Sequence, residues 1–243
     1  MFDLEDRYWW FRGRRELARS LLSRFGVWRD GDRILDVGCG TGSTLAALSD
    51  LGTTVGLDAS PEALRFCRNR NLSLLVRSPA GRIPFQNGTF HAAVALDLLE
   101  HVSDEQSVLQ EIHRVVRPGG LTLVTVPAFQ FLWSRHDVAL HHLRRYRAGE
   151  IARLMEDAGF AILKLSYAVS LLFFPIALYR LLEKLVGSRS EPETTLKPVP
   201  GPLNTFFYWL LCLEARWMRF SRLPFGVSVV CVGQKREDRS RQG

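Results

Sequence analysis

Short apolar runs alternate with helix-forming segments through the first half of this 243-residue chain. Each run is too short for a free-standing helix and too apolar for an exposed strand, which is typical of strands buried on both faces of a parallel sheet. The alternation therefore predicts an α/β fold built on a doubly wound sheet. The five runs cover residues 33–38, 53–58, 72–76, 91–97 and 121–127.

Two later runs, residues 160–169 and 226–235, complete a predicted sheet of seven strands that is mostly parallel. The long segment between them reads as two apolar helices joined by a proline-rich linker, so we predict a C-terminal helical insertion before the last strand. The uncharged run at 165–179 is shorter than the roughly 20 residues that span a bilayer, and we do not expect a transmembrane pair.

The predicted organisation has three parts. Residues 1–30 form a helical segment rich in aromatic residues and arginine, which is either a lid over a ligand or a helix packed on the sheet. Residues 31–170 and 225–236 form the Rossmann-like domain, and residues 171–224 form the helical insertion.

The bulk composition restricts the partners and the compartment. A net charge of +7 favours an anionic partner, which could be nucleic acid, an acidic lipid surface or a phosphorylated substrate. The four cysteines lie far apart without a CxxC pair, so we predict neither a disulfide framework nor a zinc knuckle. The first residues are charged throughout and do not resemble a signal peptide. Together these features predict a protein of the reducing cytoplasm.

The stretch LDVGCGTG lies where the first predicted strand turns into a helix. Gly38, Gly40 and Gly42 allow a tight turn whose backbone can approach a ligand closely. Several nucleotide-binding folds use such a pattern, and its context narrows the choice. Asp36 ends the first strand and Asp58 ends the second, where a carboxylate can accept hydrogen bonds from both hydroxyls of a ribose. No Walker lysine follows, which argues against a phosphate-binding P-loop.

Four segments in order resemble the class I S-adenosylmethionine-dependent methyltransferases, in particular the methyltransferase type 11 group. DVGCGTG resembles their glycine-rich motif, and GLDAS resembles the acidic end of their second strand. RIPFQNGTFHAAVALDLLEHV and EIHRVVRPGGLTLVTVP resemble the segments around their fourth and fifth strands. A sheet that binds NAD is the alternative, but the RPGG turn and the LDLLEH stretch argue against it. The resemblance implies the methyltransferase form of the Rossmann-like fold, with S-adenosylmethionine as the cofactor.

The resemblance also implies roles for individual residues. In the relatives an acidic residue after the third strand holds adenine, but Ser78 or Pro79 stands there in this chain. Adenine binding would then rest on backbone groups near Ala80 and on apolar packing. Arg12 could hold the carboxylate of the cofactor bidentately. The other implied cofactor residues are Gly38, Gly40 and Gly42 with Asp36 at the methionine part, Asp58 with Ala59 at the ribose, and Asp97 with Leu98 facing the methyl group.

Three of the six histidines fall in WSRHDVALHHLRRYRAGE, residues 133–150. One interpretation is a metal site formed by His136, Asp137, His141 and His142, since a histidine and another four or five residues later can share a helical face. A second is a solvated basic helix start. We favour a third, the wall of an acceptor pocket after the fifth strand, in which Arg144 or Arg145 would hold an anionic group. Together with a histidine after the fourth strand, the candidate catalytic residues are His101, His136, Asp137 and His141, and we assign no metal ion.

The predicted insertion is dense in leucine, phenylalanine and tryptophan, with arginines at its end. This composition is typical of an interfacial membrane helix or of an apolar substrate pocket, although a plain helical cap or a homodimer interface would also use it. We therefore expect methyl transfer, on oxygen, to a hydrophobic small-molecule, lipid-like or lipid-linked acceptor at an anionic membrane surface. A nucleic-acid methyltransferase is the alternative, but DLLE replaces the DPPY or NPPY tetrad of those enzymes and no RNA-binding module is recognisable, so we expect no nucleic-acid partner. A non-catalytic cofactor-binding protein at a membrane surface is the third interpretation.

Overall fold

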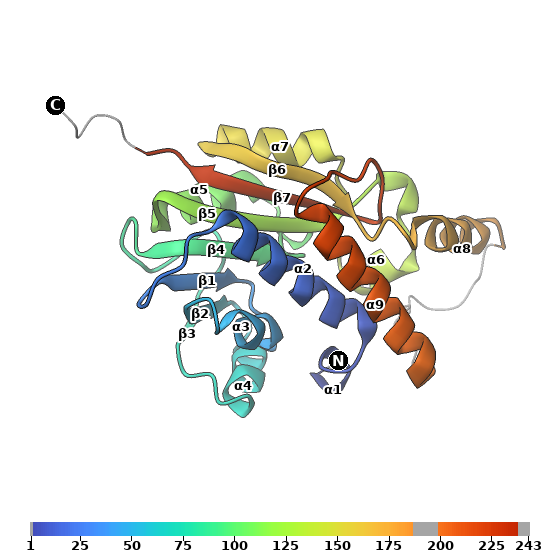
Figure 1. Ribbon diagram of the computed structural model, residues 1–243, viewed down its shortest axis with the longest axis horizontal. Helices are drawn as coiled ribbons and strands as arrows, with labels where there is room; N and C mark the ends of the chain where they lie inside the picture. Colours follow the sequence, from blue (N-terminus) through green and yellow to red (C-terminus); the bar gives the residue numbers. More distant parts are fainter. Residues whose placement is uncertain (1, 187–198, 238–243) are drawn as a thin grey trace.

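The computed structural model describes residues 2–186 and 199–237, and a seven-stranded sheet lies at its centre (Figure 1). The strand order is β3-β2-β1-β4-β5-β7-β6, and β7 runs antiparallel to both of its neighbours while the other strands are parallel. The predicted doubly wound, mostly parallel sheet is confirmed. The strands are β1 (Arg33–Val37), β2 (Thr53–Asp58), β3 (Leu75–Arg77), β4 (Phe90–Leu96), β5 (Val116–Pro127), β6 (Phe160–Ala168) and β7 (Ser228–Lys235).

Helices cover both faces of this sheet (Figure 1). Helices α2 (Trp9–Phe25) and α9 (Gly201–Met218) lie across one face, and α5 (Glu105–Val115) and α7 (Ala148–Asp157) lie on the other. Successive strand residues point to opposite faces. Ile34 therefore packs with α2 and α9, whereas its neighbour Leu35 packs with α5 and α7. Burial on both sides explains why the strands are apolar without interruption.

The remaining helices are short or lie at the ends of the sheet. Ser60 caps α4 by accepting a hydrogen bond from the Ala63 amide at 3.2 Å, with Pro61 as the first helical residue. These helices are α1 (Phe2–Glu5), α3 (Ser43–Leu48), α4 (Pro61–Asn69), η1 (Leu99–His101), η2 (Gln130–Leu132), α6 (Arg135–Ala139) and α8 (Phe173–Val186).

Two strands begin three or more residues away from the predicted position. Strand β3 begins at Leu75 instead of residue 72, because Asn71 takes a left-handed conformation and the Leu72 amide still bonds to the Cys67 carbonyl at 3.1 Å. The residues after α4 therefore complete the turn that ends the helix. Strand β5 begins at Val116 instead of residue 121, since Val116 already pairs with Phe90 of β4.

The predicted insertion contains the two expected helices, α8 and α9, and part of its proline-rich linker lies outside the described residues. The buried carboxylate of Glu214 on α9 accepts hydrogen bonds from the amides of Val169, Ser170 and Leu171, which follow β6. This contact fixes α9 to the end of the sheet. None of the helices in the described part of the chain combines the length and apolar character that crossing a bilayer requires.

Helices α2 and α9 cross closely at Gly13. A Cβ atom added to Gly13 would lie 2.2 Å from Cδ1 and 2.7 Å from Cβ of Leu211. Such distances are shorter than real contacts between carbon atoms, so a larger residue must push the helices apart.

We expect Gly13→Val to destabilise the protein by about 1–3 kcal/mol, the usual cost of overpacking a core. In a chain of this size, each 1 kcal/mol lowers the melting temperature by roughly 2–4 °C. Thermal unfolding followed by circular dichroism measures the change. Gly81→Ala is the matched control, because a Cβ atom there meets nothing within 4 Å. Equal melting temperatures for Gly13→Val and the wild type would contradict the close crossing.

Candidate active site

The glycine-rich loop between β1 and α3 adopts the backbone that its sequence predicts. Gly38, Gly40 and Gly42 have φ values of 75°, 54° and 83°, in the left-handed region that favours glycine. A Cβ atom on Gly38 would lie 2.8 Å from Cδ1 of Leu98, and one on Gly42 would lie 2.5 Å from Cδ1 of Leu72. A Cβ atom on Gly40 would meet nothing within 4 Å. The outer glycines thus pack against the protein, while the middle one borders open space that a ligand can use.

Asp58 at the end of β2 is held against this loop. Its two carboxylate oxygens accept hydrogen bonds from the amides of Gly40 at 2.9 Å and Ser60 at 2.8 Å. A carboxylate has about four acceptor sites, so two remain for the hydroxyl groups of a ligand. Ala59, the next residue, is exposed. The backbone therefore orients Asp58 before any ligand binds.

Asp36 lies within β1 directly before the loop. Its side chain is buried, and its Oδ2 atom has no hydrogen-bond partner among the described residues. Burial, with a smaller effect from the charge of Asp58, raises the pKa of Asp36 to about 7. An unsatisfied buried carboxyl beside open space fits a ligand that brings positive charge to this loop.

The N-terminal segment is fixed to the same loop. The Glu5 carboxylate accepts a hydrogen bond from the Thr41 hydroxyl and lies 3.8 Å from the guanidinium of Arg70. Arg70 donates from Nε to the Thr41 carbonyl at 3.0 Å and forms an ion pair with Asp6 at 2.7 Å. Helix α1 therefore lies beside the glycine-rich loop, in a position where a lid would lie.

An arginine of α2 reaches the carboxyl end of the sheet, but it is Arg14 and not Arg12. Arg14 forms an ion pair with Asp97 at 2.6 Å and donates to the hydroxyls of Thr125 and Ser228. It thereby joins the ends of β4, β5 and β7. The guanidinium of Arg12 instead lies 3.8 Å from the centre of the Tyr208 ring on α9.

A sequence signal for Arg14 does exist. It lies three, four and seven residues before Leu17, Ala18 and Leu21, the buried residues by which α2 packs on the sheet. Asp97, its partner, has φ of 53°, which is uncommon for a residue other than glycine. Such a backbone at a strand end is typical of a functional site.

The segment after β3 offers no carboxylate to adenine. Ser78 bonds through its amide to the Asp58 carbonyl at 3.1 Å, and Pro79 begins a turn that the Arg82 amide closes at 3.0 Å. Ala80 is half-buried and packs against the core below the sheet edge. Backbone groups and apolar contact remain for recognising a base, as the sequence predicts.

Asp137 on α6 is the centre of a buried polar network. Its oxygens accept hydrogen bonds from Arg145 at 2.8 and 2.9 Å, from the Ser134 amide at 2.8 Å and from Nδ1 of His142 at 2.8 Å. Burial opposes ionisation, but the hydrogen bonds from His142 and Arg145 outweigh it and hold the pKa of Asp137 far below its usual value. A permanently charged carboxylate with these contacts acts as an anchor, which favours a positioning role over that of a base.

The four histidines at this edge lie in different surroundings. His101 and His142 contact each other edge to face, with ring centres 4.8 Å apart. Burial and the charge of Arg180 lower the pKa of His136 to about 4, so this imidazole is neutral near pH 7. His141 is exposed and has φ of 56°. The structure thus brings together His101 with His142, a residue that the prediction left out of the catalytic set.

The arginines near Asp137 already have partners. Arg144 forms an ion pair with Glu105 at 2.6 Å, and Arg145 is paired with Asp137. Both arginines also line a hollow of about 460 Å³, so the expectation that either one holds an anionic group of the acceptor stays a prediction.

Glu100, between Leu99 and His101 in η1, is a residue that the sequence reasoning missed. It is fully buried, and neither carboxylate oxygen has a hydrogen-bond partner in the described part of the chain. Burial and the nearby charge of Asp97 raise the pKa of Glu100 well above its usual value. The only sequence signal is an acidic residue and a histidine directly after a buried strand.

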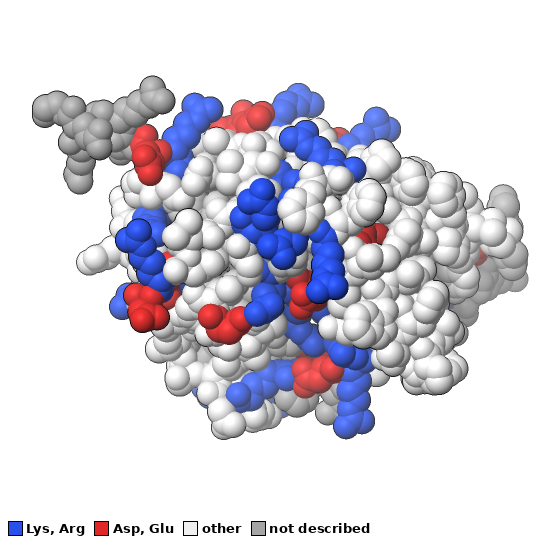
Figure 2. Space-filling model, viewed as in Figure 1, with Lys and Arg blue, Asp and Glu red and all other residues white. Residues whose placement is uncertain are grey.

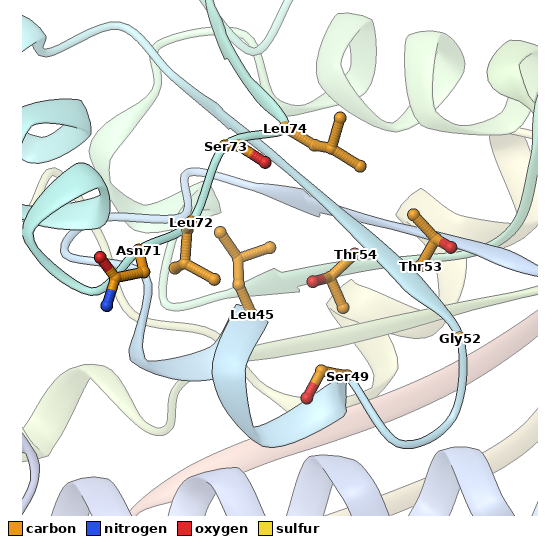
Figure 3. Close-up of a pocket in the computed structure, with 9 residues that line it drawn as sticks. All are labelled: Leu45, Ser49, Gly52, Thr53, Thr54, Asn71, Leu72, Ser73 and Leu74. Carbon is orange, nitrogen blue, oxygen red and sulfur yellow. The ribbon is translucent and has the colours of Figure 1, made fainter.

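The hollow in Figure 3 lies away from these residues. Its volume is about 280 Å³, and it is lined by α3, the start of β2 and the residues before β3, such as Leu45, Thr54 and Leu74. The glycine-rich loop and Asp58 lie at the other end of β2. In doubly wound folds ligands bind at the carboxyl ends of the strands, so this hollow is not the candidate site.

The raised pKa of Asp36 makes stability depend on pH. The unfolded chain releases this proton near pH 4, whereas the folded protein keeps it until about pH 7. The stability that this group contributes is thus lost as pH rises through that window, on the order of 4 kcal/mol in all. We therefore expect the stability of Asp36→Asn relative to the wild type, measured by urea unfolding, to be greater at pH 8 than at pH 5. Asp50→Asn, an exposed control, should show no such trend, and a trend of equal size in both variants would refute the assignment.

Comparison with known proteins agrees with this geometry. A family model described as a methyltransferase domain matches residues 35–124, which run from β1 to β5. A probable S-adenosylmethionine-dependent methyltransferase of Mycolicibacterium smegmatis is 29% identical over 163 residues, which cover 65% of this chain and 62% of that protein. The chain therefore spans less than two thirds of that relative. A demethylmenaquinone methyltransferase of Tropheryma whipplei is 29% identical over 186 residues, covering 65% of this chain and 74% of that protein.

A solved structure shares the fold over nearly the whole chain. It comes from the complex of the Haloferax volcanii Trm112 methyltransferase activator with a methyltransferase. The TM-score is 0.63 at 22% identity, and the match covers 97% of this chain and 92% of that one. The matched segment of the family model contains the glycine-rich loop, Asp58 and Asp97. Residues 35–124 therefore form a methyltransferase domain, and the chain is similar to S-adenosylmethionine-dependent methyltransferases.

Proposed function

We propose that the protein transfers a methyl group from S-adenosylmethionine to an oxygen of a hydrophobic, lipid-like or lipid-linked acceptor at an anionic membrane surface. The observation that carries this proposal is the apolar outer face of α8 and α9, which continues into the candidate site. The similarity to a demethylmenaquinone methyltransferase is in keeping with such an acceptor.

The outer face of α8 and α9 is apolar although it is exposed. At the right of Figure 2 the surface over these helices is largely without charged side chains. Trp209 exposes 63% of its surface and Phe220 exposes 79%. Arg216 and Arg222 are exposed near the end of α9. Aromatic residues beside arginines suit the boundary between lipid headgroups and acyl chains. Other exposed members are Leu171, Phe174, Leu178, Leu203, Phe206, Leu213 and Trp217.

Aromatic side chains connect this face to the histidine-rich segment. Phe173 of α8 lies 6.0 Å from Phe129, which stacks on Tyr167 at 4.7 Å between ring centres. Arg180 of α8 donates to the Leu132 carbonyl at 2.9 Å and lies 4.0 Å from Asp137. An acceptor that arrives along α8 would therefore meet the segment that carries the candidate bases.

The proposed cofactor residues are supported by the geometry of the glycine-rich loop. Gly38, Gly40 and Gly42 would face the methionine part with Asp36, Asp58 and Ala59 would bind the ribose, and Ala80 would lie at the adenine. Asp97 and Leu98 would face the methyl group. Because Arg14 is bound to Asp97, we propose Arg14 in place of Arg12 as the arginine that shapes the methyl end. Helix α1 would act as a lid, through the contacts of Glu5 with the loop, whereas α2 is packed on the sheet.

The bound cofactor supplies a sulfonium methyl group that an acceptor oxygen can displace in line. The protein must then align the acceptor and exclude water, which accounts for much of the rate. A hydroxyl acceptor must also lose its proton to a base. His101 is the best-placed candidate, because it is exposed next to the end of β4, and His136 is the second. Asp137 would act through His142 and Arg145 as a positioning residue.

Asp58→Ala should weaken binding of S-adenosylmethionine by roughly tenfold to a hundredfold. A hydrogen bond to a charged group contributes about 1.5–3 kcal/mol, and the hydroxyls of the ribose would lose theirs. Isothermal calorimetry with S-adenosylmethionine and S-adenosylhomocysteine measures this. Asp50→Ala, which removes an exposed carboxylate paired only with Arg19 in the described structure, should keep the wild-type affinity. Unchanged affinity in Asp58→Ala would remove the ribose assignment.

Replacing Trp209 and Trp217 by serine should lower binding to vesicles of phosphatidylserine and phosphatidylcholine at least tenfold. Each exposed tryptophan loses apolar area that would otherwise enter the interface. Sedimentation with vesicles measures binding, and Leu74→Ser is the control, since Leu74 is 49% exposed and directly precedes β3, at the edge of the sheet opposite to β6. Equal sedimentation of the double variant and the wild type would contradict a membrane-facing insertion.

The acceptor itself is tested with radiolabelled S-adenosylmethionine. Lipid extract, a short-chain quinol and total RNA are supplied to the wild-type protein in separate reactions. Label in the lipid or quinol fraction supports the proposal. Label in RNA alone would replace it with a nucleic-acid methyltransferase, and tight cofactor binding without transfer to any fraction would favour the non-catalytic interpretation.

A further inference from the structure

The buried Glu100 carboxylate faces two imidazole rings. A donor atom of Glu100 lies within 4.8 Å of a ring nitrogen of His101 and of His142, and the two ring nitrogens lie within the same distance of each other. Glu100 and His101 come from η1 after β4, whereas His142 comes from the loop after α6. The fold thus joins two segments about forty residues apart into one cluster.

Glu100 is unusual because nothing in the described part of the chain satisfies it. Its side chain is 0% exposed and both of its oxygens lack a hydrogen-bond partner. Buried carboxylates in proteins are normally paired, hydrogen-bonded or bound to a metal ion. The protein therefore needs either a proton or a cation at this position.

His142 is held in the form that a metal ion requires. The Asp137 carboxylate is ionised and can only accept, so Nδ1 of His142 carries the proton in their 2.8 Å hydrogen bond. The lone pair of Nε2 is then available. A carboxylate that orients a histidine through its other ring nitrogen is the usual arrangement behind metal ligands. Arg145 fixes Asp137 from the opposite side.

We propose that Glu100, His101 and His142 bind a divalent first-row transition ion, such as Zn²⁺ or Mn²⁺. Two imidazoles and one carboxylate form a donor set that such ions favour, and three protein ligands leave a coordination position open. This site differs from the metal site that the sequence suggested. The sequence suggested His136, Asp137, His141 and His142 as ligands, and only His142 belongs to the proposed site.

The position of this ion gives it a use in the proposed function, on which this step rests. Glu100 and His101 follow Asp97, the residue expected beside the transferred methyl group. With the ion bound, His101 would be a ligand, and His136 would remain as the candidate base. An acceptor hydroxyl bound at the open position would lose its proton more readily and would be oriented toward that end of β4. Binding of the ion itself does not depend on methyl transfer.

The test is metal binding by the whole chain after dialysis against a chelator. Zn²⁺ and Mn²⁺ are titrated by calorimetry, and Co²⁺ is titrated with visible absorption to detect nitrogen ligands. We expect one ion per chain and a Co²⁺ spectrum. Glu100→Gln, which keeps the size of the side chain, and His142→Gln should each weaken binding at least tenfold. His113→Gln, a histidine packed on Phe160 at the other side of the fold, should keep the wild-type affinity.

Equal affinity in Glu100→Gln and the wild type, or no stoichiometric ion with any of the three metals, would overturn the site and leave Glu100 as a protonated acid. Thermal unfolding checks that each variant folds, and Glu100→Gln should be at least as stable as the metal-free wild type. Cofactor affinity is measured separately on the metal-free protein. Metal binding without transfer to any acceptor keeps the site and rejects the proposed function, whereas transfer that survives complete removal of metal rejects the catalytic use of the ion.

Discussion

Burial of the central strands on both faces is the constraint on which the rest of this structure depends. Because α2 and α9 cover one face and α5 and α7 cover the other, no polar chemistry can occur within the sheet. Ligands can reach backbone and charged groups only where strands end, and in parallel strands these ends fall on one edge. The same burial that stabilises the fold therefore gathers the glycine-rich loop, Asp58, Asp97 and Glu100 there.

That edge is held in shape by buried charges, and not by apolar packing alone. Arg14 joins three strand ends through Asp97, Thr125 and Ser228, and Asp137 joins α6 to the loop after it through Arg145. Removing one partner of the buried Arg145–Asp137 pair leaves an uncompensated buried charge, which costs several kcal/mol. The Arg14–Asp97 pair contributes less, because the Asp97 side chain is 35% exposed. Each of these residues is thus essential to the geometry of the site even where it touches no ligand.

The sequence predicts the parts of the molecule that are encoded locally. The strand alternation, the left-handed glycines and the helix start at Ser60 each follow from a few neighbouring residues, and the structure agrees with them. The choice between Arg12 and Arg14 was missed although the sequence carries a signal for it, since only Arg14 has the helical spacing that places it on the buried side of α2 with Leu17, Ala18 and Leu21. Glu100 and His142 meet only through folding across forty residues, so no spacing rule on one helix could have paired them.

Asp36 and Glu100, at two ends of one candidate site, are both buried carboxyl groups whose ionised form is destabilised by burial. Both are buried carboxyl groups with oxygens that the described protein leaves unsatisfied, and burial raises the pKa of each. A fold selected only for stability would replace such groups by apolar residues, because an unpaired buried carboxylate opposes folding. Their presence beside open backbone at the strand ends is best explained by positively charged partners that arrive from outside. For Asp36 we propose that this partner is the cofactor, whose sulfonium and amino groups are cationic, and for Glu100 that it is the metal ion.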